Sequence, residues 1–106
     1  MKNDTRLKKE KDFNLVFKKG KRIYGKNLTL IYFPAPFFKV GYVVSKKHGN
    51  SVKRNKIKRL MRESFRSFTI NRNNFFFVLL PKISEEYSYE LFKKDMEFVL
   101  NKGQFL

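Results

Sequence analysis

Residues 51–68 place the strongest constraint on the fold, because their apolar side chains recur with the period of an α-helix. With about 100° of rotation per residue, these side chains fall within roughly 80° of Ile57 on a helical wheel. The stripe consists of Ile57, Leu60, Met61, Phe65 and Phe68. The pattern predicts one helix over the whole segment, with this stripe packed against the rest of the protein.

The other side of this predicted helix is strongly basic. Seven lysines and arginines lie in residues 51–68, opposed by Glu63 alone. Like charges three and four residues apart repel each other, and cations near the N-terminus oppose the helix dipole. We therefore expect an anionic partner; the alternative is a solvated charged face, which usually mixes both signs. The polar line is Asn55, Arg59, Arg62 and Arg66, flanked by Lys56 and Lys58, with Lys53 and Arg54 in the first turn.

The whole chain shares this charge. Its 106 residues contain 25 Lys and Arg against 9 Asp and Glu, a formal net charge of +16. A field of this sign favours a polyanion, either nucleic acid or an acidic membrane surface. No apolar run reaches the ~18 residues of a membrane span, the N-terminus lacks a secretory signal, and cysteine is absent. These features predict a cytoplasmic protein that binds a polyanion.

Two further helices are predicted near the ends of the chain. Phe13, Val16 and Phe17 share one face of a short helix, which Gly20 is expected to end in a left-handed conformation. A basic, mobile tail over residues 1–9 is expected before it. The last helix is expected to stop at Gly103. Its apolar stripe consists of Tyr89, Phe92, Met96, Val99 and Leu100.

Four segments have the character of strands. After a short strand at residues 23–24, residues 28–33 and 37–45 are predicted to pair antiparallel across the turn at residues 34–36. Residues 75–80 are all apolar, which predicts a strand covered on both faces. The order α-β-β-β-α-β-α, without repeats or a long linker, predicts one α+β domain over residues 1–106 with a central four-stranded sheet.

Residues for catalysis are scarce in this chain. An enzyme acting through its side chains needs a nucleophile with a base, paired carboxylates or metal ligands. The one histidine, His48, lies in a basic loop and is expected to be a surface residue. We therefore predict that the chain alone is not a catalyst and has no small-molecule substrate.

One stretch carries a more specific pattern. The sequence VSKKHGNSVKRNKIKRLMRESFR resembles the signature of bacterial ribonuclease P protein subunits, with its SKK, its Gly-Asn and its basic helix. DFNLVFKKGKR near the start and the apolar strand before Pro81 and Lys82 support the resemblance. It implies a ribosomal protein S5 domain 2-like fold, with a left-handed crossover through the second helix.

The resemblance also implies a function. In that family a catalytic RNA carries out metal-dependent hydrolysis that removes the 5′ leader of precursor tRNA, and the protein binds both RNAs. Magnesium is expected on the RNA partner and no cofactor on the protein, and whether the protein holds a metal near its cleft is left open. Contacts with the catalytic RNA are implied for Lys53, Arg54, Asn55, Lys56, Lys58, Arg59 and Arg62. A leader-binding cleft is implied for Phe13, Phe17, Ile31, Phe33, Lys46 and Lys47.

The chain departs from the family at one position of the signature. Arg-Asn-Arg appears here as Arg54, Asn55 and Lys56. Lysine keeps the charge but lacks the planar fork with which arginine holds a phosphate through two hydrogen bonds. A weaker or more diffuse contact is expected at Lys56.

Bland alternatives remain at this stage. Phe13 and Phe17 could be plain core residues, and Arg66, beyond the family motif, could be a free surface residue. A structural RNA-binding protein, such as a small ribosomal protein, would share the charge and the α+β shape. A membrane-surface protein built on the basic helix is a third class, disfavoured because the apolar stripe is needed to cover the sheet.

Overall fold

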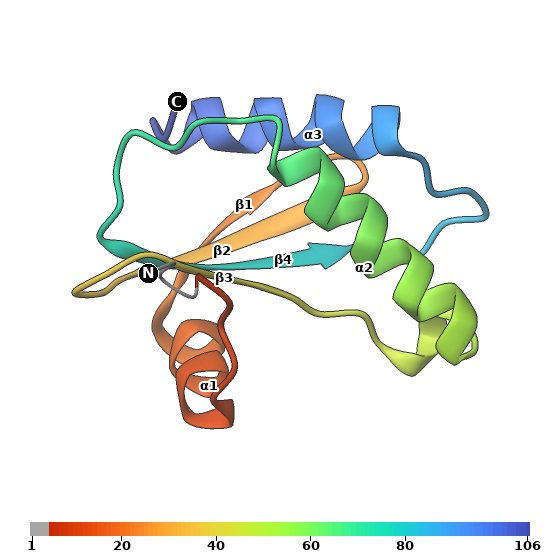
Figure 1. The fold of residues 1–106 in the computed structure, drawn as a ribbon, viewed down its shortest axis with the longest axis horizontal. Helices are drawn as coiled ribbons and strands as arrows, with labels where there is room; N and C mark the ends of the chain where they lie inside the picture. The colour runs from red at the N-terminus through yellow and green to blue at the C-terminus, as the bar shows by residue number, and fades with distance from the viewer. Residues whose placement is uncertain (1–4) are drawn as a thin grey trace.

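The computed structural model describes residues 5–106 and shows one mixed sheet between two layers of helices. In Figure 1, α1 lies below the sheet and α2 and α3 lie above it. The predicted α-β-β-β-α-β-α order and the single α+β domain are confirmed. The elements are α1 (Glu10–Lys19), β1 (Lys21–Tyr24), β2 (Leu28–Pro34), β3 (Lys39–Tyr42), the short 3-10 helix η1 (Lys46–His48), α2 (Ser51–Phe65), β4 (Phe75–Pro81) and α3 (Tyr89–Lys102).

The strand order corrects one prediction. The sheet runs β1-β2-β4-β3, with β2 antiparallel to both β1 and β4 and with β3 parallel to β4. Residues 37–45 were predicted to pair with residues 28–33, and this was wrong, because β4 lies between them. The physical reason is that β4 is apolar on both sides. Phe77 and Leu79 are buried beneath α2 and α3, whereas Phe76 and Val78 are buried on the side of α1, so β4 gains most from a central position.

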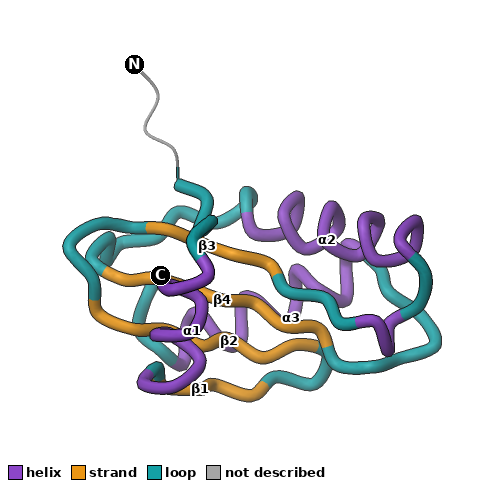
Figure 2. The backbone as a smooth tube through the Cα atoms, turned by 90° about the horizontal axis from the view of Figure 1, so that it is seen from below, coloured by secondary structure: helices purple, strands orange, loops and turns teal. Residues whose placement is uncertain are grey.

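The connection from β3 to β4 is the left-handed crossover that the resemblance implied. Figure 2 views the sheet from the side of α1, with β3 above β4 and α2 on the far side of the sheet. The two strands are parallel, and Figure 1 shows β4 running from left to right. A chain that leaves β3, passes behind the sheet through α2 and returns in β4 turns in a left-handed sense, against the usual preference.

The apolar stripe of α2 anchors it to the sheet as predicted. Ile57, Met61 and Phe65 are buried, and Leu60 and Phe68 are partly buried against the same core. The helix itself ends at Phe65, three residues earlier than expected. Residues 66–68 continue as a turn in which the Phe68 amide donates to the Phe65 carbonyl oxygen at 3.1 Å, so Phe68 still reaches the core.

The start of the chain is more ordered than a mobile tail. Among residues 5–9, the Leu7 amide donates to the Val40 carbonyl at 2.9 Å, and the Val40 amide donates to the Thr5 carbonyl at 2.8 Å. Leu7 is buried beside α1. The expected tail therefore docks on the outer edge of β3 over the part that the structure describes, and its residues 1–4 lie outside that part. Gly20 ends α1 in an extended conformation (φ −71°, ψ 155°), not in a left-handed one.

An acidic residue that the sequence patterns did not single out holds the β1–β2 turn. Asp95 of α3 is only 6% exposed. Its carboxyl oxygens accept hydrogen bonds from the backbone amides of Lys26 at 3.0 Å, Asn27 at 2.7 Å and Leu28 at 2.8 Å. A side chain at Gly25 would collide with this carboxyl group. The turn and α3 are thus joined through buried hydrogen bonds.

Candidate nucleic-acid interface

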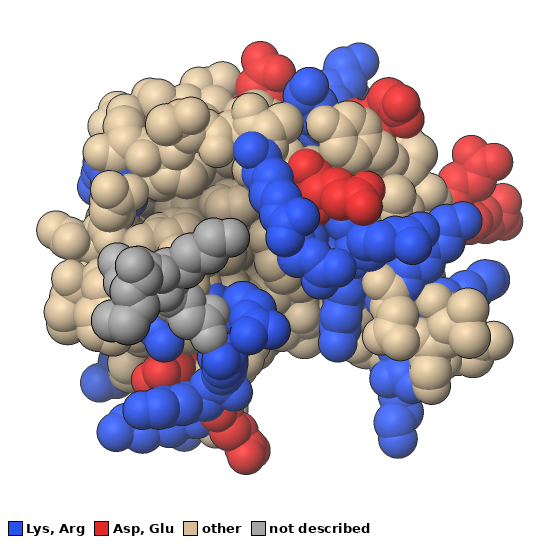
Figure 3. All heavy atoms as spheres, in the orientation of Figure 1, with Lys and Arg blue, Asp and Glu red and all other residues tan. Residues whose placement is uncertain are grey.

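The outer face of α2 presents a band of cations. Asn50 fixes the start of the helix, because its side-chain oxygen accepts from the Lys53 amide at 2.9 Å. Beyond it, Asn55, Arg59 and Arg66 are exposed, and Arg62 is half-buried. Figure 3 shows lysine and arginine atoms running over α2, with a second group over α1. Within the described residues, the acidic residue Glu63 approaches the Arg59 guanidinium at 4.0 Å in an exposed contact that is worth little.

A shallow hollow runs along this face. It is lined by Asn55, Lys56, Arg59 and Arg62, together with the exposed side chain of Val52. Next to these residues in the sequence, the Nε atom of Arg54 is buried and has no hydrogen-bond partner. A buried donor without an acceptor is costly, so this guanidinium is suited to an incoming oxygen atom, such as that of a phosphate.

A groove lies at the edge of the sheet, between α1, the end of β3 and α2. Its aromatic side chains are Phe13 and Phe17 from α1 and Tyr42 from β3. Phe13 approaches the sheet closely because position 41 is glycine, and a side chain there would collide with its ring. Phe13 and Phe17 pack partly on the core beneath α1 and are partly exposed. They therefore serve as core residues on one side and as groove walls on the other. The remaining lining residues are Lys8, Glu10, Val43, Val44 and Lys58.

Tyr42 is the groove residue that sequence reasoning missed. Strand alternation placed it with Val40 and Val44 toward the main core, and its ring does contact Phe65 at 6.4 Å between centroids. Because β3 is an outer strand that ends at this residue, the ring also borders the groove. Burial raises the pKa of its hydroxyl, while the charges of Arg62 and Arg66 act in the opposite direction.

Four residues assigned to the cleft lie outside the groove. Ile31 is fully buried beneath α1, so its side chain has no surface to offer a ligand. Phe33 is partly buried against the same cluster. Lys46 and Lys47 are exposed on η1 and do not line the groove. The position of a third aromatic side chain, which the alignment gave to Ile31, is taken by Tyr42 on a different strand.

His48 has a structural role that the sequence did not reveal. Its Nε2 atom lies 2.9 Å from the Pro81 carbonyl oxygen, and its Nδ1 atom accepts from the Ser45 amide at 3.2 Å. Both contacts fit a ring that carries its proton on Nε2. The following residue, Gly49, has a φ of 123°, which other residues rarely adopt. His48 and Gly49 thus fix the turn from η1 into α2 and are not part of a reactive site.

Comparison with known proteins decides which family builds this surface. The family model described as Ribonuclease P matches residues 1–104. The chain belongs to the ribonuclease P protein family. It is 37% identical over 111 residues to the ribonuclease P protein component of Listeria innocua, with 100% of this chain and 93% of the relative covered.

Solved structures of ribonuclease P proteins share the fold. The protein from Staphylococcus aureus superposes with a TM-score of 0.83 at 27% identity, covering 97% of this chain and 98% of that one. The protein from Thermotoga maritima gives a TM-score of 0.77 at 27% identity, covering 92% and 96%. The resemblance seen in the sequence is confirmed: the chain is a subunit of ribonuclease P, a tRNA-processing endoribonuclease that contains RNA. The alternative of a small ribosomal protein is set aside.

Within this ribonuclease P protein, Lys58 joins the two parts of the surface. It belongs to α2 and to the basic signature, yet its side chain lines the groove opposite Phe13 and Phe17. Lys56, where the family pattern has arginine, faces two ways. It lines the hollow with Arg59 and also a second hollow that contains Glu85 and Glu86, so nearby acidic charge moderates this position. None of the helices in residues 5–106 is long and apolar enough to cross a membrane.

Proposed function

We propose that α2 holds the catalytic RNA of ribonuclease P and that the groove between α1 and β3 holds the 5′ leader of precursor tRNA. The observation that carries this proposal is the groove itself. It combines partly exposed aromatic rings with lysine side chains, and it opens beside the cationic face of α2. One bound RNA and one bound substrate can then meet across Lys58.

The groove chemistry suits a single strand of variable sequence. Phe13, Phe17 and Tyr42 offer ring faces on which any base can stack, and Lys8 and Lys58 provide positive charge along a phosphate backbone. Such a site needs no base-edge readout, which a leader of variable sequence could not satisfy. The structure thus supports a leader path through Tyr42 rather than Ile31.

The face of α2 suits phosphates of a folded RNA. Arg59 and Arg62 lie one turn apart on its outer side, and Arg54 carries the unpartnered Nε donor. Arginine forks hold phosphate oxygens through paired hydrogen bonds. Hydrolysis is assigned to the RNA and its magnesium ions, and the protein positions the substrate, in the cytoplasm where both RNAs occur.

Reconstitution tests the function as a whole. Adding the protein to ribonuclease P RNA at low magnesium should speed removal of the leader, because the protein's cations replace part of the counterion charge. Precursor tRNA should also be bound in preference to mature tRNA. The measurement is single-turnover cleavage of a labelled precursor, with mature tRNA as competitor. Equal binding of the two tRNAs would remove the support for a leader site.

Replacing Phe17 with alanine tests the groove. Loss of one stacking ring should weaken binding of precursor tRNA by roughly tenfold, while binding of mature tRNA stays unchanged. Phe17→Leu is the matched control for packing, because leucine fills apolar space without offering a ring. If Phe17→Leu binds precursor normally and Phe17→Ala mainly lowers the melting temperature, Phe17 is a core residue and the groove proposal fails.

A further inference from the structure

The outer strand β1 and the exposed side of α3 form an apolar patch that the proposed RNA contacts do not use. Tyr24 is 62% exposed, Phe98 51% and Leu91 39%. These three side chains line one hollow of about 630 Å³, a volume within the range of ligand sites. Clustered exposed apolar side chains of this kind mark interaction surfaces.

The rim of this patch is basic. Lys26, Lys82 and Lys94 line the same hollow, and the Lys102 ammonium lies 5.7 Å from the centroid of the Phe98 ring. The one carboxyl group in the lining, that of Asp95, already accepts three backbone hydrogen bonds from the β1–β2 turn. The patch therefore presents ring faces surrounded by positive charge.

The charge selects the occupant. A second copy of the chain would set these lysines, and +16 of net charge, against an identical surface. A single-stranded nucleic acid matches both properties, because its bases stack on aromatic rings and its phosphates pair with lysine. We propose that Tyr24 and Phe98 form a second binding site for a single-stranded RNA segment. Since β1 and β3 are the two outer strands, this site lies at the sheet edge opposite the leader groove and does not depend on it.

A tryptophan reporter can test this site directly, because the chain contains no tryptophan. In the Tyr24→Trp variant, an oligouridylate should quench the fluorescence of the introduced tryptophan in a saturable way, since stacking brings a base onto its ring. A phosphate–deoxyribose oligomer of the same length without bases should give no quenching. Equal quenching by the base-free oligomer would overturn the proposal.

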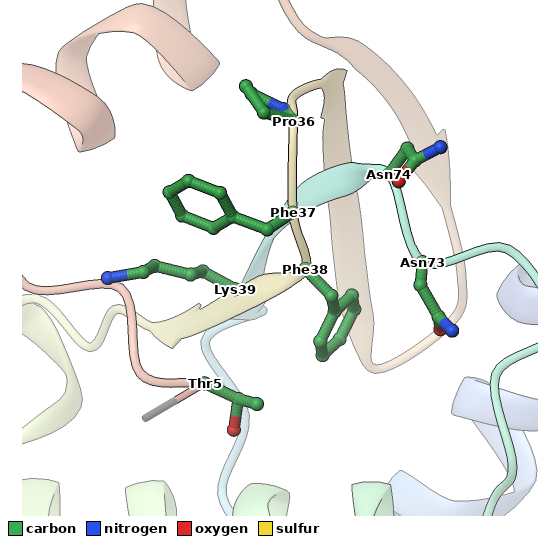
Figure 4. Close-up of a pocket in the computed structure, with 7 residues that line it drawn as sticks. All are labelled: Thr5, Pro36, Phe37, Phe38, Lys39, Asn73 and Asn74. Atoms are coloured by element: carbon green, nitrogen blue, oxygen red, sulfur yellow. The ribbon is translucent and has the colours of Figure 1, made fainter. Parts of the chain in front are cut away.

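Matched variants separate this site from the others. Adding Phe98→Ala to the reporter variant should raise the Kd by at least about fivefold. Phe37→Ala is the control, because Phe37 is 53% exposed but lies beyond the other end of the sheet, at the loop before β3. Figure 4 shows Phe37 and Lys39 extending in the same direction there, away from Phe38. This control should leave the Kd unchanged, and an equal effect of both variants would contradict the assignment.

Two further outcomes distinguish this proposal from its alternatives. Adding Phe17→Ala to the reporter variant should leave the quenching intact, so a failed leader site does not imply a failed second site. If the tryptophan emission instead changes with protein concentration in the absence of RNA, and Phe98→Ala abolishes that change, the patch joins two copies of the chain and the RNA proposal is wrong.

Discussion

Raising the salt concentration from 50 to 200 mM should weaken binding of this protein to the catalytic RNA by about a thousandfold, if about six phosphates are neutralised on the counterion-release scale for duplexes. Six cations of α2 belong to the proposed contact. They are Lys53, Arg54, Lys56, Lys58, Arg59 and Arg62. Their side chains range from exposed to half-buried, so counterions have access to them before the RNA binds. The measurement is the Kd by filter binding over this salt range.

The slope of this salt dependence identifies the residues responsible. The double variant Arg59→Ala, Arg62→Ala should reduce the slope of log Kd against log salt by about two contacts' worth. Both side chains lie off the buried stripe, so the variant should fold normally, as circular dichroism would show. Replacing Lys21 and Arg22 on β1, which lies at the far edge of the sheet, serves as the control of equal charge. A nearly salt-independent affinity would show that phosphates do not carry the binding.

Replacing Asp95 with alanine should destabilise the fold by about 3 kcal/mol or more, because three backbone amides lose a common acceptor in a largely buried place. For a chain of this size the melting temperature should fall by roughly 15 °C. Asp95→Asn should cause most of the same loss, since one carboxyl oxygen is replaced by an amide nitrogen that cannot accept. Thermal unfolding followed by circular dichroism measures both variants.

A neighbouring acidic residue provides the control for this loss. Glu97 lies two residues further along α3 and is exposed, so Glu97→Ala should change the free energy of unfolding by no more than about 0.5 kcal/mol. Full stability in the Asp95→Asn variant would show that the hydrogen bonds to the β1–β2 turn contribute little. The second RNA site borders this turn, so its geometry is expected to change with Asp95.

The helices were predictable because their signals are local. The stripe around Ile57 repeats at 3.6 residues, and Asn50 and Ser88 supply side-chain caps at the starts of α2 and α3. The all-apolar run of β4 indicated a strand with two covered faces, which the structure confirms. The end of α2 was less predictable, because residues 66–68 keep the apolar spacing after the helix has stopped.

Strand pairing was not predictable in the same way. Residues 28–33 and 37–45 are joined by a short turn, and a local rule pairs them, but β4 lies between them in the sheet. That choice depends on contacts between segments that are far apart in the sequence, and on the burial that β4 gains between two neighbours. The docking of Thr5 and Leu7 on β3 has the same long-range origin.

The sequence alone determined the family, the basic face of α2 and the aromatic pair on α1, since each depends on residue types at short spacings. Only the tertiary structure decided which residues meet. It buried Ile31, brought Tyr42 to the groove and turned Lys58 toward the same space. It also committed the Asp95 carboxyl group to the β1–β2 turn and left Tyr24 beside Phe98. Such neighbours are set by packing and backbone hydrogen bonds across the whole domain, for which a local pattern carries no signal.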